Sequence, residues 1–261
     1  MNIVNNEIDG GRPFDWGKTS SDYARYRDIY PVEFYENIVK RGVGTEGQKA
    51  LDLGTGTGVI PRNMYRFGAK WTGCDISENQ ILQAKKLSEG MDIEYYARPT
   101  EALGFPAGSF DVITACQCFF YFDHEKVAGI LHDILRDGGK LLVLYMAWLP
   151  EEDRIAGESE KLVLKYNPGW TGCGEHIHPI FIPECYDGKF RLTFHDEYRL
   201  GVPFTRESWN GRIKACRGIG ASLSEDKIAE WEKEHTELLE KIAPEKFEIM
   251  HYAAMAELER I

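Results

Sequence analysis

The feature that most constrains the fold is a regular alternation of short apolar runs and helix-like segments between Lys49 and Met146. A helical segment follows Asp123, where apolar residues recur at the spacing of one helix face. Such alternation predicts a mostly parallel sheet covered by helices on both faces, which is a doubly wound α/β fold. The expected strands are KALDL, KWTGCD, DIEYYA, FDVITAC and KLLVLYM.

The residues after this block depart from the alternation. Residues 151–183 look irregular, and FRLTFHDEYRL at 190–200 looks like a further strand. A helix is expected from about Glu225 to Ile242, introduced by a possible Ser222/Glu225 capping box. The first part of KFEIMHYAAMAEL, which closes the chain, could be another strand.

Composition limits the classes of partner. The 261 residues are 43% hydrophobic and 28% charged, which is enough for one sizeable core. The formal net charge of -11 argues against nucleic-acid binding, because a phosphate backbone is held mainly by Lys and Arg. We expect a small-molecule partner, with no nucleic acid and no membrane, and a monomer or homodimer.

The same sequence predicts a cytoplasmic location. No basic segment followed by an apolar core opens the chain, and the longest apolar run, Leu141 to Leu149, covers about half a membrane span. Six cysteines are scattered from position 74 to position 216 without a dense framework, so reduced thiols are the expected state.

Three glycines at alternate positions, Gly54, Gly56 and Gly58, stand where the first strand turns into a helix. Open parallel sheets bind ligands at such turns, and glycine lets a ligand approach the backbone. The dinucleotide pattern G-x-G-x-x-G is not met, because its third glycine falls on Val59 or Pro61. A glycine-rich turn without any ligand is the alternative.

DLGTGTG, residues 52–58, resembles motif I of the class I S-adenosylmethionine-dependent methyltransferases. GCDIS, the stretch ARPTEALGFPAGSFDVITACQCFFYFD and RDGGKLLV follow in the order and at the spacing of that family. The resemblance covers about Lys49 to Met146 and is closest to small-molecule enzymes of the methyltransferase type 11 branch. It implies a seven-stranded Rossmann-like sheet, with a sixth and an antiparallel seventh strand from the C-terminal third.

The resemblance also implies roles for individual residues. Asp75 would accept the ribose hydroxyls, Ile76 would pack on adenine, and Thr100 and Glu101 would lie near it. The backbone at Cys116 and Gln117 would lie near the methionine end. The remaining cofactor-binding candidates are the acid and the turn residues of motif I, namely Asp52, Gly54, Thr55, Gly56 and Gly58.

The segment SSDYARYRDIYP resembles the lead-in of the trans-aconitate-like branch of the family. There Tyr23, Tyr26 and Arg27 could close over the cofactor, with Arg27 meeting its carboxylate, although a structural helix with packed tyrosines is an equal alternative. We therefore expect one domain over 1–261. It would comprise a helical cap (1–45), a cofactor-binding core (46–148), and a substrate-side insertion after the fifth strand with the C-terminal strands (149–261).

Methyl transfer from this cofactor needs a nucleophile held in line and water excluded, and it needs a base only when the acceptor must lose a proton. Aromatic residues near the ends of the fourth and fifth strands and in the following segment are acceptor-pocket candidates, although such a residue, taken alone, is more often core than pocket. They are Phe119, Phe120, Tyr121, Tyr145, Trp148 and Trp170.

His176 and His178 are weak candidates for a general base. With Cys173 and Cys185 they are zinc-type ligands, but the spacing lacks a paired C-x-x-C, and we expect no metal. Two other functions stay open: a protein or nucleic-acid methyltransferase, and a non-catalytic module that binds the cofactor.

Overall fold

The computed structural model describes residues 9–13, 26, 28–174 and 177–261. The strands are β1 (Lys49–Leu53), β2 (Lys70–Asp75), β3 (Ile93–Ala97), β4 (Phe110–Cys116), β5 (Leu135–Trp148), β6 (Phe190–Thr205) and β7 (Lys246–Arg260). The α-helices are α2 (Val32–Lys40), α3 (Val59–Met64), α4 (Glu78–Leu87), α5 (His124–Ile134), α6 (Arg154–Tyr166), α7 (Arg206–Lys214) and α8 (Glu225–Ile242). Short 3-10 turns are η1 (Asp9–Gly11), η3 (Tyr65–Phe67), η4 (Thr100–Ala102), η5 (Phe119–Tyr121) and η6 (Glu184–Tyr186).

The strands form one mixed seven-stranded sheet in the order β3-β2-β1-β4-β5-β7-β6. The pairs β1–β2, β1–β4, β2–β3 and β4–β5 are all parallel. The doubly wound α/β prediction is therefore confirmed, as are all five strands expected between Lys49 and Met146. The sixth and seventh strands do come from the C-terminal third of the chain.

By its internal contacts the chain divides into two compact units. The sheet unit comprises Tyr30–Met146, His178–Tyr198 and Ala253–Ile261, and the helical unit comprises Met1–Ile29, Ala147–Ile177 and Arg199–Tyr252. Strands β5, β6 and β7 each run from one unit into the other. Helices α6, α7 and α8 belong to the helical unit.

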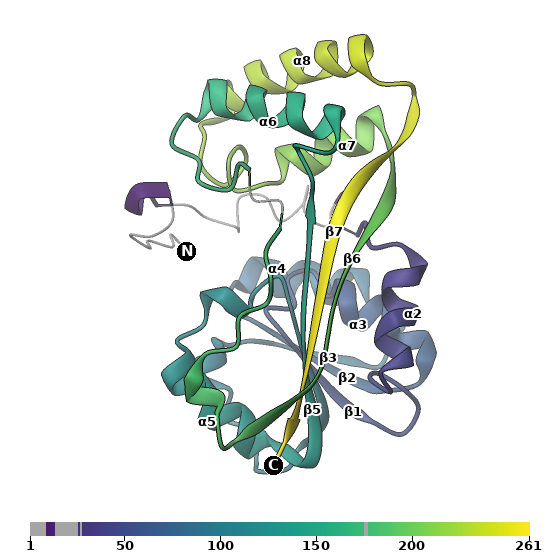
Figure 1. The fold of residues 1–261 in the computed structure, drawn as a ribbon, viewed down its shortest axis with the longest axis vertical. Helices are drawn as coiled ribbons and strands as arrows, with labels where there is room; N and C mark the ends of the chain where they lie inside the picture. The colour runs from purple at the N-terminus through teal and green to yellow at the C-terminus, as the bar shows by residue number, and fades with distance from the viewer. Residues whose placement is uncertain (1–8, 14–25, 27, 175–176) are drawn as a thin grey trace. The chain divides into compact units, whose positions relative to one another are not determined.

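Both faces of the central strands in the sheet unit are buried. On β1, Leu51 and Leu53 join a core that includes Val127 and Leu131 of α5. The alternate residue Ala50 is also fully buried, so the opposite face is covered as well. In Figure 1, α2 and α3 lie on one side of these strands and α5 on the other.

Two expectations about the C-terminal part are wrong. Residues 151–183 are not irregular throughout, because α6 occupies Arg154–Tyr166, where Asp153 caps the first turn by accepting hydrogen bonds from Ile155 N and Ala156 N. The helix predicted from Glu225 to Ile242 is present as α8, but the Ser222/Glu225 capping box is not. Its N-cap is Ser224, and Ser222 instead donates to the carbonyl of Arg217.

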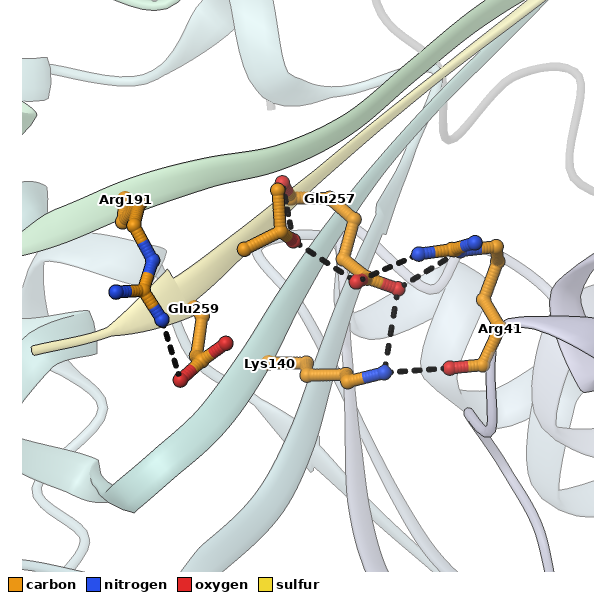
Figure 2. Close-up of polar contacts among 6 residues, drawn as sticks. Arg41, Lys140, Arg191, Glu257 and Glu259 are labelled. Carbon is orange, nitrogen blue, oxygen red and sulfur yellow. Dashed lines mark hydrogen bonds and ion pairs between the residues drawn. The ribbon is translucent and has the colours of Figure 1, made fainter.

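A buried carboxylate ties β5, β6 and β7 to the end of α2 (Figure 2). Glu257 accepts hydrogen bonds from Arg41 Nε at 3.1 Å and Nη2 at 3.0 Å, from Thr193 Oγ1 at 2.9 Å and from Lys140 Nζ at 3.4 Å. Burial raises the pKa of Glu257, but the hydrogen bonds outweigh it and the pKa is lowered. Glu257 therefore stays ionised as a structural junction of the sheet unit.

No helix among the described residues has both the length and the apolar character that a membrane crossing requires.

Candidate active site

The turn between β1 and α3 needs glycine for two reasons. Gly54, Gly56 and Gly58 have φ values of 55°, 56° and 77°, a region that L side chains rarely adopt. A Cβ on Gly54 would lie 2.6 Å from Cβ of Cys118, and one on Gly58 would lie 2.9 Å from Cζ of Tyr95. The turn is therefore packed directly against β3 and the segment after β4.

Asp75 ends β2 beside this turn, because the parallel register pairs Leu53 with Cys74. Its Oδ2 accepts a hydrogen bond from Gly56 N at 2.9 Å and its Oδ1 accepts one from Ser77 N at 2.8 Å. Burial raises the pKa of Asp75, while these two hydrogen bonds act to lower it. The carboxylate is thus fixed to the glycine turn and to the start of the helix capped by Ser77.

Asp52 lies beneath the turn and is only 1% exposed. Its Oδ1 accepts a hydrogen bond from Thr114 Oγ1 of β4 at 2.7 Å. Burial raises the pKa of Asp52 to about 7, against the lowering effect of Thr114 and Thr55. The carboxyl group therefore braces β1 against β4 and titrates near neutral pH.

Residues after β2 and β3 border the same edge of the sheet. Ile76 is 49% exposed, while Thr100 is buried in η4. Glu101 accepts a hydrogen bond from Asp123 N at 3.1 Å through Oε1, which fixes its side chain toward the start of α5. Ile76 is consequently the one of these three residues that presents a large apolar side chain to solvent.

Gln117 follows β4 and has φ of 64°, which is unusual for a residue other than glycine. Its backbone N donates to Leu144 O at 2.9 Å, and its side-chain Nε2 donates to Met146 O. These two bonds lie on either side of Tyr145 and fasten the turn after β4 to the end of β5. Cys116, just before, donates from Sγ to the Tyr30 hydroxyl at 3.4 Å.

The aromatic candidates divide into core and surface residues. Phe119 is 5% exposed and belongs to the core under α5. Phe120 and Tyr121 are 47% and 37% exposed, with ring centroids 4.3 Å apart. Phe120 also contacts Tyr145, and both contact His178.

Trp148 and Trp170 lie in the helical unit, and both are buried. Trp148 donates from Nε1 to Glu160 Oε1 at 2.6 Å, and the Arg212 guanidinium lies 4.7 Å from its ring centroid. Trp170 is so close to Gly218 that a Cβ there would be 2.8 Å from its ring. Both tryptophans serve as packing residues of that unit.

Three candidates, Tyr23, Arg27 and His176, lie outside the described residues. In the part of the chain that is described, no group of three or more His, Cys, Asp and Glu side chains could hold a metal ion. Cys173 belongs to the helical unit, whereas His178 and Cys185 belong to the sheet unit.

Sequence reasoning missed three residues that shape the turn. Tyr95 of β3 fills the space beside Gly58, and its hydroxyl lies 2.9 Å from Ser88 Oγ. Gly73 of β2 is needed because a Cβ there would lie 2.7 Å from the Tyr95 ring. Cys118 donates from Sγ to Leu53 O at 3.1 Å. No local pattern marks these residues, since each acts through a contact with another strand.

A doubly wound sheet with an acid-bearing glycine turn after β1 and a carboxylate at the end of β2 defines a Rossmann-like, ligand-binding α/β protein. Residues 51–143 match the family model described as a methyltransferase domain. This match and the relatives below support a class I S-adenosylmethionine-dependent methyltransferase, an enzyme that transfers methyl groups to small molecules.

Curated relatives agree with this assignment. The chain is 29% identical over 212 residues to the ubiquinone biosynthesis O-methyltransferase of Nitrosococcus oceani, covering 80% of this chain and 77% of that protein. It is 28% identical over 160 residues to the protein of the same description from Pseudomonas entomophila, covering 60% of this chain and 68% of that protein.

Solved structures show the fold. A candidate type II methyltransferase from Anaeromyxobacter dehalogenans matches with a TM-score of 0.56 at 19% identity, covering 89% of this chain and 96% of that one. The [4+2]-cyclase SpnF matches with a TM-score of 0.51 at 16% identity, covering 87% of this chain and 80% of that one. Because a cyclase has this fold too, the fold alone does not specify the reaction.

The residues at the turn fit the methyl donor used by this family. Each oxygen of Asp75 accepts one backbone N–H, and a carboxylate oxygen has two lone pairs. One lone pair on each oxygen is therefore left to accept a ribose hydroxyl.

Proposed function

We propose that this chain binds S-adenosylmethionine at the Gly54–Gly58 turn. Asp75 accepts the two ribose hydroxyls, Ile76 packs on the adenine, and Thr100 and Glu101 border it. The backbone of Cys116 and Gln117 receives the methionine end. The observation that carries the proposal is the hydrogen bond between Asp75 and Gly56 N, because it places a carboxylate against the glycine turn at the carboxyl ends of two parallel strands.

We further propose that the acceptor is a hydroxyl-bearing small molecule bound beyond Gln117. The relatives named above are described as O-methyltransferases, and the exposed rings of Phe120 and Tyr121 follow Gln117 directly. When bound, the donor supplies an electrophilic methyl group. The chain's own residues then hold the acceptor oxygen in line with that group and exclude water.

Calorimetric titration tests the cofactor site. We expect micromolar binding of S-adenosylmethionine and no binding of NAD. Asp75→Asn should weaken the affinity roughly 10- to 100-fold, because it removes hydrogen bonds to a charged acceptor. Asp92→Asn is the matched control, since Asp92 is an exposed aspartate and should leave the affinity unchanged.

Three outcomes would contradict the proposal. Binding of NAD instead of S-adenosylmethionine would indicate a different cofactor. Equal affinities of the wild type and Asp75→Asn would remove Asp75 from the ribose site. Tight binding without methyl transfer to any small acceptor would favour a non-catalytic, cofactor-binding module.

We also propose a cytoplasmic location. The support is that none of the six cysteines belongs to a disulfide, and the cytosol keeps cysteines in this reduced state. A thiol count on the protein purified without reductant tests this, and fewer than six free thiols would contradict it.

A further inference from the structure

Three rings from three separate parts of the sheet unit contact one another. The His178 ring lies 5.0 Å from the Tyr145 ring and 6.1 Å from the Phe120 ring, with which it is nearly parallel at 25°. The Phe120 and Tyr145 rings are 6.2 Å apart at 74°. We call these three residues the aromatic triad. It brings together the turn after β4, the end of β5 and the segment before η6.

One wall of the triad is fixed and one is open. Tyr145 is 8% exposed, and the two hydrogen bonds from Gln117 hold the backbone on both sides of it. Phe120 is 47% exposed and is extended by Tyr121, which is 37% exposed. A rigid buried ring beside two exposed rings presents an aromatic surface at the point where the methionine end of the donor is proposed to lie.

From this geometry we infer that the acceptor is a planar aromatic compound carrying a hydroxyl group, and that His178 is its general base. The inference rests on the proposed function and specifies its substrate class. Exposed aromatic faces favour a flat, apolar ring, which stacks on them in offset or edge-to-face geometry. Imidazole is the side chain that most often accepts protons in catalysis, and His178 is the imidazole of the triad.

The reaction balances without a further reagent. The hydroxyl proton of the acceptor passes to a ring nitrogen of His178, and an oxygen lone pair forms the new bond to the methyl carbon. The bond between that carbon and sulfur breaks, and its electron pair stays on sulfur. His178 later releases the proton to water.

Two planar aromatic acceptors, one that must lose a proton and one that need not, separate base catalysis from simple packing. Catechol carries a hydroxyl that is protonated at pH 7, whereas 4-nitrothiophenol is already a thiolate at that pH and needs no base. We expect His178→Gln to lower kcat/KM for catechol by roughly 100-fold or more, which is the usual contribution of a general base. The same variant should methylate 4-nitrothiophenol within about threefold of the wild type and bind S-adenosylmethionine with unchanged affinity.

His195→Gln is the matched control, because His195 is a surface residue of the same unit that lies 3.5 Å from Glu197. It should leave both activities unchanged. If His178→Gln lowers kcat/KM equally for both acceptors, His178 only packs against Phe120 and Tyr145, and its role as a base would be overturned. Failure of the wild type to methylate either compound, while it binds S-adenosylmethionine, would overturn the substrate class. Failure to bind S-adenosylmethionine would instead contradict the proposed function itself.

Discussion

Replacing Asp52 with asparagine should increase the stability of the protein, relative to the wild type, as pH rises from 5 to 8. Asp52 is 1% exposed, and burial raises its pKa from 3.8 to about 7. The folded state therefore holds the Asp52 proton more tightly than the unfolded state does. Below pH 3.8 Asp52 is protonated in both states and costs no stability. The free energy of unfolding falls as pH rises from 3.8 to about 7, and above about pH 7 the loss is constant.

The size of the effect follows from the two pKa values. Each tenfold difference in proton affinity corresponds to about 1.4 kcal/mol. By linkage, the ionisation of Asp52 reduces the free energy of unfolding by about 1.5 kcal/mol at pH 5 and by about 4 kcal/mol at pH 8. Asp52→Asn has no such titration, and its amide oxygen can still accept the Thr114 hydroxyl.

The assay is urea unfolding of the wild type and Asp52→Asn without cofactor at pH 5 and pH 8. We expect the variant to gain roughly 2 to 3 kcal/mol relative to the wild type between the two pH values. Taking this difference removes the pH effects that both proteins share. A difference that stays within about 0.5 kcal/mol across the pH range, the error expected of such comparisons, would refute the reasoning.

Three further predictions concern stability, each measured by urea or thermal unfolding. Gly58→Ala should destabilise the protein by more than Gly90→Ala. Both residues have positive φ, at 77° and 87°, but only Gly58 faces a ring within 3 Å, so equal losses would contradict the packing argument. His235 is buried and its pKa is lowered to about 3, so stability should fall as pH drops from 6.5 toward 3. His235→Gln should reduce this loss of stability at low pH. If the variant and the wild type show the same dependence of stability on pH, His235 is not its source. Glu257→Gln should cost about 3 kcal/mol because it breaks a buried ion pair, whereas Glu259→Gln, in a more exposed pair with Arg191, should cost under about 1 kcal/mol; similar losses would refute this.

The sheet could be predicted because its strands and helices differ in local pattern. Strands buried on both faces are continuous apolar runs, and α5 carries its buried residues at helical spacing. Helix α6 was missed because three of its inward positions are Ala156, Ser159 and Glu160, which weaken the apolar stripe. Glu160 is buried there because it accepts a hydrogen bond from Trp148, a partner that the local sequence does not indicate.

The site divides in the same way. The glycine turn and Asp75 could be predicted, because each follows its own strand and parallel strands end at one edge. Phe119 and Phe120 could not be distinguished, since the neighbouring rings differ only in the direction that η5 gives them. His178 meets Phe120 and Tyr145 only through tertiary structure, across more than 30 residues of sequence.

Because three strands cross between the two units, the protein cannot be cut into separate sequence fragments that each contain one whole unit. The chain passes between units within β5 at Met146, within β6 at Tyr198 and within β7 at Tyr252, so neither unit is a continuous stretch of sequence. A gene fragment limited to residues 46–148 would keep β4 but lack β7, the other neighbour of β5, and would leave the backbone N–H and C=O groups on one edge of that long strand without partners. Such a fragment should aggregate, although it contains the whole region that matches the methyltransferase family. The segment that carries the family signature is therefore not an autonomous folding unit, and truncation or domain-swapping strategies need to retain the C-terminal strands.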